Sequence, residues 1–189
     1  LLCFGDSNGS IDLTVTGGQS GYTYNWGAGQ PTTQDRTGLT AGMYCVTVTD
    51  ANGCTKTACA TITQPPVLVV STTQINVSCN GGSNGTIDLT VTGGQAGYTY
   101  NWGAGQPTTQ DRTGLTAGVY CVTVTDANGC TKTTCATITE PSVLVATTTQ
   151  VNVLCNGAST GSIDLTVSGG TLVYTYNWGA GQPTTQDRS

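Results

Sequence analysis

The residues of this chain that could do covalent chemistry are its nine cysteines. The sequence contains no histidine, so it holds no Ser, His and Asp set for nucleophilic catalysis, and we expect no catalytic residue and no cofactor. Cysteines in this number without a metal-binding histidine indicate disulfide bonds made in an oxidising compartment. A zinc site between two cysteine-rich turns is the alternative, although the cysteine spacings fit no compact zinc finger.

A β-hairpin should position two of these cysteines. Residues 44–49 alternate between apolar and polar side chains, which is typical of a strand with one buried face. The sequence at 50–53, Asp-Ala-Asn-Gly, then predicts a turn, because Asp favours the first turn position and Gly accepts the positive φ of a bulge. A return strand is expected over residues 55–63.

The register of this hairpin predicts the first cross-link. Antiparallel pairing around the turn places Cys45 directly opposite Cys59, and directly opposite residues have Cβ atoms about 4.5–5.5 Å apart, which is near disulfide geometry. Cys54 lies at the turn, and we expect it to form the second disulfide with Cys3, at the beginning of the repeat. A disulfide between Cys54 and Cys79, joining neighbouring domains, would instead show that the domain boundary lies elsewhere.

The sequence repeats almost letter for letter. Cys3, Cys79 and Cys155 are spaced 76 residues apart, and the hairpin pair recurs as Cys121 and Cys135. The register partner of Cys155 would fall after the last residue of the sequence. A fixed period of this length indicates an array of small domains, which favours a stalk, a fibre or a multivalent surface over an enzyme.

Each repeat is predicted to be all-β. Residues 10–16 alternate in the same way as 44–49, and residues 22–26 place two tyrosines and a tryptophan on one face, whereas no segment shows helical periodicity. About seven short strands in one repeat predict a small antiparallel β-sandwich of immunoglobulin type. Trp102 is expected in its core, with carbohydrate stacking as the alternative. The predicted core residues are Ile87, Leu89, Val91, Tyr100, Trp102, Tyr120, Val122, Val124 and Ile138.

Proline follows the return strand of each repeat, which places domain boundaries near residues 64 and 140. Residues 65–140 would then form a complete repeat domain. Residues 1–64 would form a domain that lacks its leading strand, and residues 141–189 a domain truncated before its last hairpin. Because both ends are out of register with the domains, we expect the sequence to be part of a longer array.

The composition points to a location outside the cell. Charged residues make up 8% of the chain, and the net charge is −5 with five Lys and Arg. Such a surface offers no basic patch for nucleic acid or for an anionic membrane. No apolar run approaches the roughly 20 residues that a membrane-spanning helix needs.

Four aspartates are candidate calcium ligands at domain junctions. Asp50 and Asp126 begin predicted turns, and Asp12 and Asp88 lie on predicted strands, so turn formation and a solvated outer face explain them as well. The spacing of acidic and glycine residues in known calcium loops is absent, which favours the structural explanation.

Threonines form another recurring group on the faces expected to point outward. They could carry O-glycans, or present hydroxyl groups to ice or polysaccharide. The simpler explanation is the high strand propensity of threonine on a wet face. The threonines concerned are Thr14, Thr16, Thr47, Thr49, Thr55 and Thr57.

The second repeat carries an ordered set of motifs, which are CNGGSNGTIDL (79–89), GG (93–94), YTYNW (98–102), GL (114–115), AGVY (117–120) and VTVTDANGC (122–130). In this order they resemble the SprB repeat, a module of very large surface adhesins in gliding and related Bacteroidota. The resemblance covers essentially the whole chain.

The resemblance implies extracellular, tandem, immunoglobulin-like modules that usually serve adhesion or gliding, and it supplies no catalytic residues. It also implies a disulfide between Cys79 and Cys130, which agrees with the pairing expected in the first repeat. Cys121 and Cys135 depart from the commoner pattern of two cysteines and indicate a variant hardened against mechanical or chemical stress.

These observations predict the structural repeat region of an extracellular filament, fibre or adhesin stalk, acting as a semi-rigid, force-bearing spacer at the cell surface. The alternative is a multivalent array that binds carbohydrate or another surface, which an exposed aromatic patch would favour. An accessory region of a secreted enzyme is a third class. The expected partners are further copies of the repeat, in the same or neighbouring chains, with the apolar segment 67–70 as the contact; surface polysaccharide is a further candidate.

Overall fold

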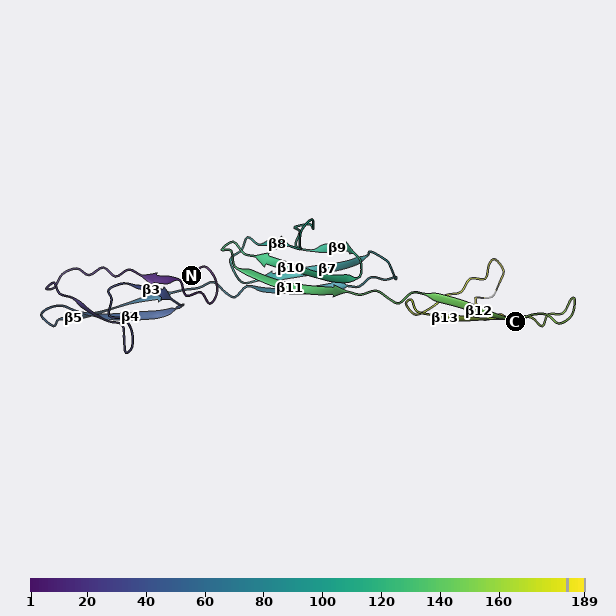
Figure 1. The fold of residues 1–189 in the computed structure, drawn as a ribbon, viewed down its shortest axis with the longest axis horizontal. Helices are drawn as coiled ribbons and strands as arrows, with labels where there is room; N and C mark the ends of the chain where they lie inside the picture. The colour runs from purple at the N-terminus through teal and green to yellow at the C-terminus, as the bar shows by residue number, and fades with distance from the viewer. Residues whose placement is uncertain (183, 189) are drawn as a thin grey trace. The chain divides into compact units, whose positions relative to one another are not determined.

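The computed structural model describes residues 1–182 and 184–188, and the regular structure in them consists of β-strands (Figure 1). No helix occurs in this part of the chain, which confirms the all-β prediction. The first repeat contains β1 (Gly9–Ile11), β2 (Thr23–Asn25), β3 (Arg36–Leu39), β4 (Gly42–Thr49) and β5 (Thr55–Ile62). The second contains β6 (Val69–Ile75), β7 (Gly85–Thr92), β8 (Thr99–Asn101), β9 (Arg112–Leu115), β10 (Gly118–Thr125) and β11 (Thr131–Ile138). The third contains β12 (Val145–Val151) and β13 (Ser162–Ser168).

Period-two alternation explains why these segments are strands. In β7, Ile87 and Leu89 are buried whereas Asp88 and Thr90 are exposed. Only an extended backbone sends successive side chains to opposite faces in this way, so one face of β7 joins the core and the other meets water.

The second repeat forms two three-stranded antiparallel sheets, with the strand orders β6-β7-β9 and β11-β10-β8. This is the order of the A-B-E and C-F-G sheets of the immunoglobulin sandwich. The repeat has six strands where about seven were expected. In the first repeat β2, β4 and β5 form one sheet and β1 pairs with β3, and in the third repeat β12 pairs with β13.

A tyrosine stabilises the loop that precedes β10. The hydroxyl group of Tyr120 donates a hydrogen bond of 3.0 Å to the carbonyl oxygen of Thr116. Tyr44 donates the same bond to Thr40, also at 3.0 Å, before β4. A tyrosine at this position whose hydroxyl bonds back to the preceding backbone is the tyrosine corner of immunoglobulin-like sandwiches.

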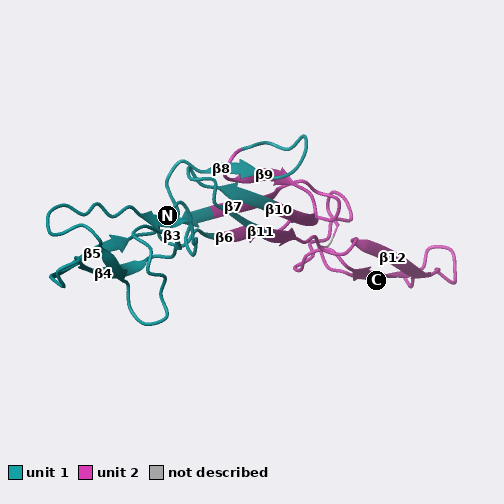
Figure 2. Cartoon of the chain, turned by 60° about the vertical axis from the view of Figure 1, so that its left-hand side comes forward, with its two compact units in different colours: residues 1–71, 90–108, 122–134 teal, residues 72–89, 109–121, 135–189 magenta. Residues whose placement is uncertain are grey.

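Contacts divide the chain into two compact units (Figure 2). Unit 1 comprises residues 1–71, 90–108 and 122–134, and unit 2 comprises residues 72–89, 109–121 and 135–189. The strands β6, β7, β10 and β11 each contribute residues to both units. The domain boundaries expected near residues 64 and 140 remain a prediction.

Each unit has its own set of buried apolar side chains. In unit 1 these are Leu39, Val46, Val48, Leu68, Trp102, Val122 and Val124, and in unit 2 they are Val77, Ile87, Leu89, Leu115, Ala136 and Ile138. Most of the predicted core is therefore buried, including Trp102 at 8% exposure. Val91, Tyr100 and Tyr120 are half-buried instead.

Candidate functional site: the repeat junctions

The hairpin of β4 and β5 has the predicted register. Thr49 lies opposite Thr55 and Cys45 opposite Cys59. The structure joins Cys45 to Cys59, whose Cα atoms are 4.0 Å apart. This close spacing is that of a non-hydrogen-bonded antiparallel pair, the position at which two cysteines directly opposite can reach each other.

The hairpin of the second repeat has the same cross-link. Cys121 and Cys135 are joined, with Cα atoms 4.0 Å apart. Beside this disulfide the hydroxyl oxygens of Thr123 and Thr133 are 2.9 Å apart, so these threonines bond to each other across the strands. The pair formed by the equivalent threonines of the first hairpin, Thr47 and Thr57, measures 3.0 Å.

The structure differs from the expected Cys3–Cys54 disulfide, because it joins Cys3 to Cys130 of the second repeat. The loop that contains Cys3 is held at the far end of β5. The N-terminal amine donates to the carbonyl oxygen of Thr63 at 2.9 Å, and the N–H of Gly5 donates to the side chain of Gln64 at 2.8 Å. Cys54 precedes β5, whose eight residues span about 26 Å at about 3.3 Å each, whereas a disulfide needs Cα atoms within about 7 Å.

The same geometry explains why the expected Cys79–Cys130 disulfide is absent. The loop that contains Cys79 is held at the far end of β11, because Gly81 and Asn80 both donate to the carboxylate of Glu140, which follows that strand. Cys130 immediately precedes β11, whose eight residues span about 26 Å at about 3.3 Å each. The loop and the turn therefore lie at opposite ends of one repeat.

Three cysteines are unpaired among the described residues, and all three are exposed: Cys54, Cys79 and Cys155. Cys79 and Cys155 correspond to Cys3, and Cys54 corresponds to Cys130, at the 76-residue spacing of the repeats. The one disulfide between repeats thus joins a loop cysteine of one repeat to a turn cysteine of the next.

Hydrogen bonds accompany this disulfide at the first junction. The side-chain amide of Asn128, in the hairpin turn of the second repeat, donates to the carbonyl oxygen of Leu2 at 2.8 Å. Together with the bonds of Gly5 and the N-terminus to residues 63–64, this places the loop at 1–6 between the end of its own repeat and the turn of the following one.

The second junction is built in a similar way. The N–H of Gly81 donates to the carboxylate of Glu140 at 2.7 Å, and the amide of Asn80 donates to the same carboxylate at 3.1 Å. The loop is therefore held at the end of its own repeat. On its other side the hydroxyl of Thr171, in the third repeat, donates to the carbonyl oxygen of Ser78 at 3.3 Å.

The linkers between repeats are also held in place. The N–H of Gly94 donates to the carbonyl oxygen of Pro66 at 3.0 Å, and that of Gly170 donates to Ser142 at 2.9 Å. Gly93 has a positive φ of 71°, and a Cβ atom there would lie 1.9 Å from the carbonyl oxygen of Val67. Only glycine permits this approach, so the double-glycine turn packs directly against the backbone of the preceding linker.

In the apolar segment 67–70, which the sequence offered for contact between chains, Leu68 is buried and Val67 and Val69 are exposed. One face of the segment therefore packs into the core, and the other face is exposed to solvent. Its role in contact between chains remains a prediction.

The two turn aspartates organise the hairpin turns. The carboxylate of Asp126 is 4% exposed and accepts hydrogen bonds of 2.9 Å from the backbone N–H groups of Gln95, Asn128 and Cys130. These donors, Gln95 first, hold the pKa of Asp126 below its ordinary value, although burial acts in the opposite direction. Asp50 has a lowered pKa for the same reason, with Gln19 as the leading donor.

The other candidate ligands do not converge. Asp12 and Asp88 are exposed on the outer faces of their segments. Across residues 1–182 and 184–188 no three His, Cys, Asp or Glu side chains gather closely enough to hold a metal ion. The oxygens of Asp50 and Asp126 are occupied by backbone donors, so these carboxylates act as turn caps.

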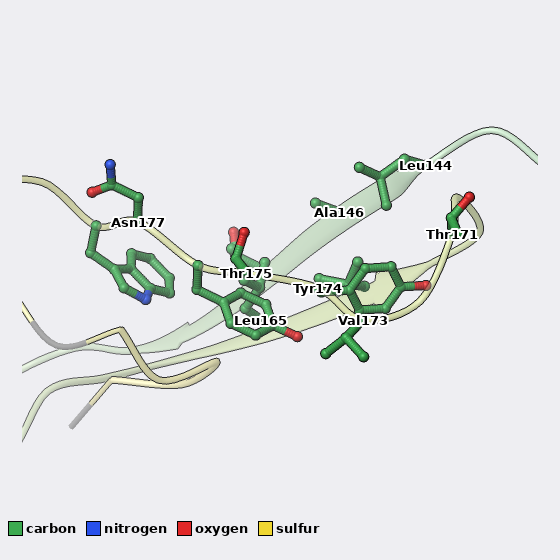
Figure 3. A pocket seen from close by; sticks show the side chains of 12 residues that line it. Leu144, Ala146, Leu165, Thr171, Val173, Tyr174, Thr175 and Asn177 are labelled. Atoms are coloured by element: carbon green, nitrogen blue, oxygen red, sulfur yellow. The ribbon is translucent and has the colours of Figure 1, made fainter. Parts of the chain in front are cut away.

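An apolar cavity of about 480 Å³ opens in the third repeat (Figure 3). Leu144 and Leu165 line it, and they correspond to Leu68 and Leu89, which are buried in the second repeat. Among the described residues of this repeat, β12 and β13 are the strands, and no counterpart of β10 or β11 covers them. The cavity is therefore the uncovered core face of this repeat.

Most aromatic side chains of the described residues are at least half-buried. Every tyrosine and tryptophan in them is buried or half-buried, and Phe4 is the exposed aromatic residue. No described segment forms a helix long and apolar enough to cross a bilayer.

Comparison with known proteins agrees with the repeat structure. No curated protein matches the chain. The SprB repeat family matches residues 1–31, 71–107 and 147–183, which together make up more than half of the sequence and end at the 76-residue spacing seen in the cysteines. This family is a structural repeat of cell-surface, adhesin-associated proteins and not a family of enzymes. The chain therefore belongs to the SprB repeat family.

Proposed function

We propose that this chain is a structural region of an extracellular filament, fibre or adhesin stalk, in which it acts as a semi-rigid spacer that bears force. The disulfide from Cys3 to Cys130 is the observation that carries this proposal, because it limits the distance between its two attachment points whether or not the repeats are folded. Disulfides of this kind persist outside the reducing cytoplasm, which agrees with a cell-surface location.

The disulfide shortens the path that tension follows. When the two ends are pulled, force passes through the Cys3–Cys130 bond. The chain between these cysteines, which are 127 residues apart in the sequence, therefore cannot be extended. At about 3.4 Å per residue the enclosed chain represents about 430 Å of length. A surface stalk with this cross-link would keep its span even if the enclosed strands opened.

The junction contacts support a limited range of bending. The linker carbonyl of Pro66 is bonded to Gly94, and that of Ser142 to Gly170, so neither linker is free to swing as an unstructured tether. Proline stiffens the same segments. A spacer needs this property, because a flexible string of domains collapses to a short average distance.

Single-molecule pulling between the two ends tests the proposal. The oxidised chain should release about 340 Å less length than a Cys3→Ser, Cys130→Ser double variant that keeps both hairpin disulfides, because about 99 more residues can extend in the variant. Adding a reductant to the parent chain should release about 430 Å more.

The control is a Cys45→Ser, Cys59→Ser variant, whose missing disulfide lies inside the enclosed segment and should not change the released length. Released lengths that do not shrink on oxidation would refute the force-bearing role. Compact globular particles in electron micrographs of the native material would refute the filament.

A further inference from the structure

The cysteines that remain free occupy the same repeat positions as the two that are cross-linked between repeats. Cys79 lies in the loop between β6 and β7 and corresponds to Cys3 in the loop before β1. Cys54 follows the hairpin turn of the first repeat and corresponds to Cys130, which follows that of the second. The Cys3–Cys130 disulfide therefore shows the partner of a loop cysteine, which is the cysteine after the hairpin turn of the following repeat.

The surroundings of Cys79 point to the same partner. Cys79 lines an open hollow together with Val143, Leu144 and Thr171 of the third repeat. The backbone just before it accepts a hydrogen bond from Thr171, as the backbone before Cys3 accepts one from Asn128. Two separate junctions thus turn the cysteine-bearing loop of one repeat toward the next repeat.

We propose that Cys79 is the cross-linking site for the cysteine that follows the hairpin turn of the next SprB repeat, and that consecutive repeats are joined in this way along the array. By the same rule Cys54 takes the loop cysteine of a preceding repeat. Each bond forms when two thiols pass two electrons and two protons to a disulfide oxidant such as oxidised glutathione, which leaves as two thiols. The cross-link requires no assumption that the array bears force.

The linkers make this pairing favourable within one chain. A loop and a turn in adjacent repeats are held near each other by linkers bonded to the double-glycine turns, so their effective concentration is high. A loop and a turn of the same repeat are kept one strand length apart. The pattern therefore favours bonds between neighbours over bonds within a repeat.

An extended chain tests the site directly. A copy of residues 114–140 is placed after Ser189, in register, so that the third repeat gains a hairpin and a turn cysteine. The chain is oxidised in a glutathione buffer and mapped by mass spectrometry without reduction. The added turn cysteine should be bonded to Cys79, and alkylation should label Cys54 and Cys155 alone. A bond from the added cysteine to Cys155, or a free added cysteine, would overturn the proposal.

The unextended chain gives a second test that does not depend on the added segment folding. In a Cys3→Ser variant, Cys130 loses its partner, and it should remain a free thiol that alkylation labels. Formation of a Cys79–Cys130 disulfide in this variant would show that Cys79 can pair within its own repeat, which the proposal forbids. Cys45→Ser is the matched control, because it should leave the Cys3–Cys130 bond intact.

Discussion

Cys3 and Cys130 have Cα atoms 5.7 Å apart although 127 residues separate them in the sequence. The bond connects the first loop of one repeat to the hairpin turn of the next. It adds a cross-link between two repeats that each have a hairpin disulfide of their own.

The first prediction concerns the linker. Gly93→Ala should destabilise the chain by about 2 kcal/mol or more, because a left-handed backbone disfavours Ala and its Cβ would overlap the carbonyl oxygen of Val67. Gly17 is the matched control, because it occupies the corresponding turn position of the first repeat and has a φ of 78°. No atom would lie within 4 Å of a Cβ added there. Gly17→Ala should cost about 1–2 kcal/mol. Chemical denaturation of both variants measures the difference. Equal losses would show that the linker contact contributes nothing.

The second prediction concerns acid. The backbone N–H groups around Asp126, Gln95 first, lower the pKa of its carboxyl in the folded state. A lowered pKa stabilises the fold above the ordinary carboxyl value of 3.8, and this contribution is lost as the pH falls below it. Asp126→Asn should therefore be less stable than the parent at neutral pH, and the gap should close in acid. Asp88→Asn, at an exposed strand position, is the control. A gap that persists unchanged to pH 2 would contradict the turn-cap role.

The third prediction compares equivalent leucines. Leu89 is fully buried in the second repeat, so Leu89→Ala should cost about 2–5 kcal/mol through lost contacts and the cavity left behind. Leu165 occupies the same position in the third repeat but lines an open cavity. Leu165→Ala should cost clearly less. Unfolding curves in urea test this, and equal costs would mean that the third repeat is as well covered as the second.

Local patterns made much of the fold predictable. Alternation over residues 44–49 and the turn at 50–53 were enough to give the register of β4 and β5, because both depend on neighbouring residues. The burial of Trp102 followed from the aromatic face at 98–102 in the same way.

The partner of Cys3 depended on topology instead. Cys54 and Cys130 stand in identical local sequences, so no nearby residue distinguishes them. The choice follows from which end of the repeat each segment occupies, and this depends on the packing of the whole repeat. The close contact between Gly93 and Val67 could not be predicted from the sequence either, because a double glycine predicts a turn but not the linker that packs against it.

Non-reducing peptide mapping of the oxidised chain is the most direct measurement of the central claim, that a disulfide cross-links consecutive repeats. The account predicts a peptide pair containing Cys3 and Cys130, and hairpin pairs containing Cys45 with Cys59 and Cys121 with Cys135. Alkylation should label Cys54, Cys79 and Cys155. A peptide pair that joins Cys3 to Cys54 would contradict it, because each repeat would then be closed on itself.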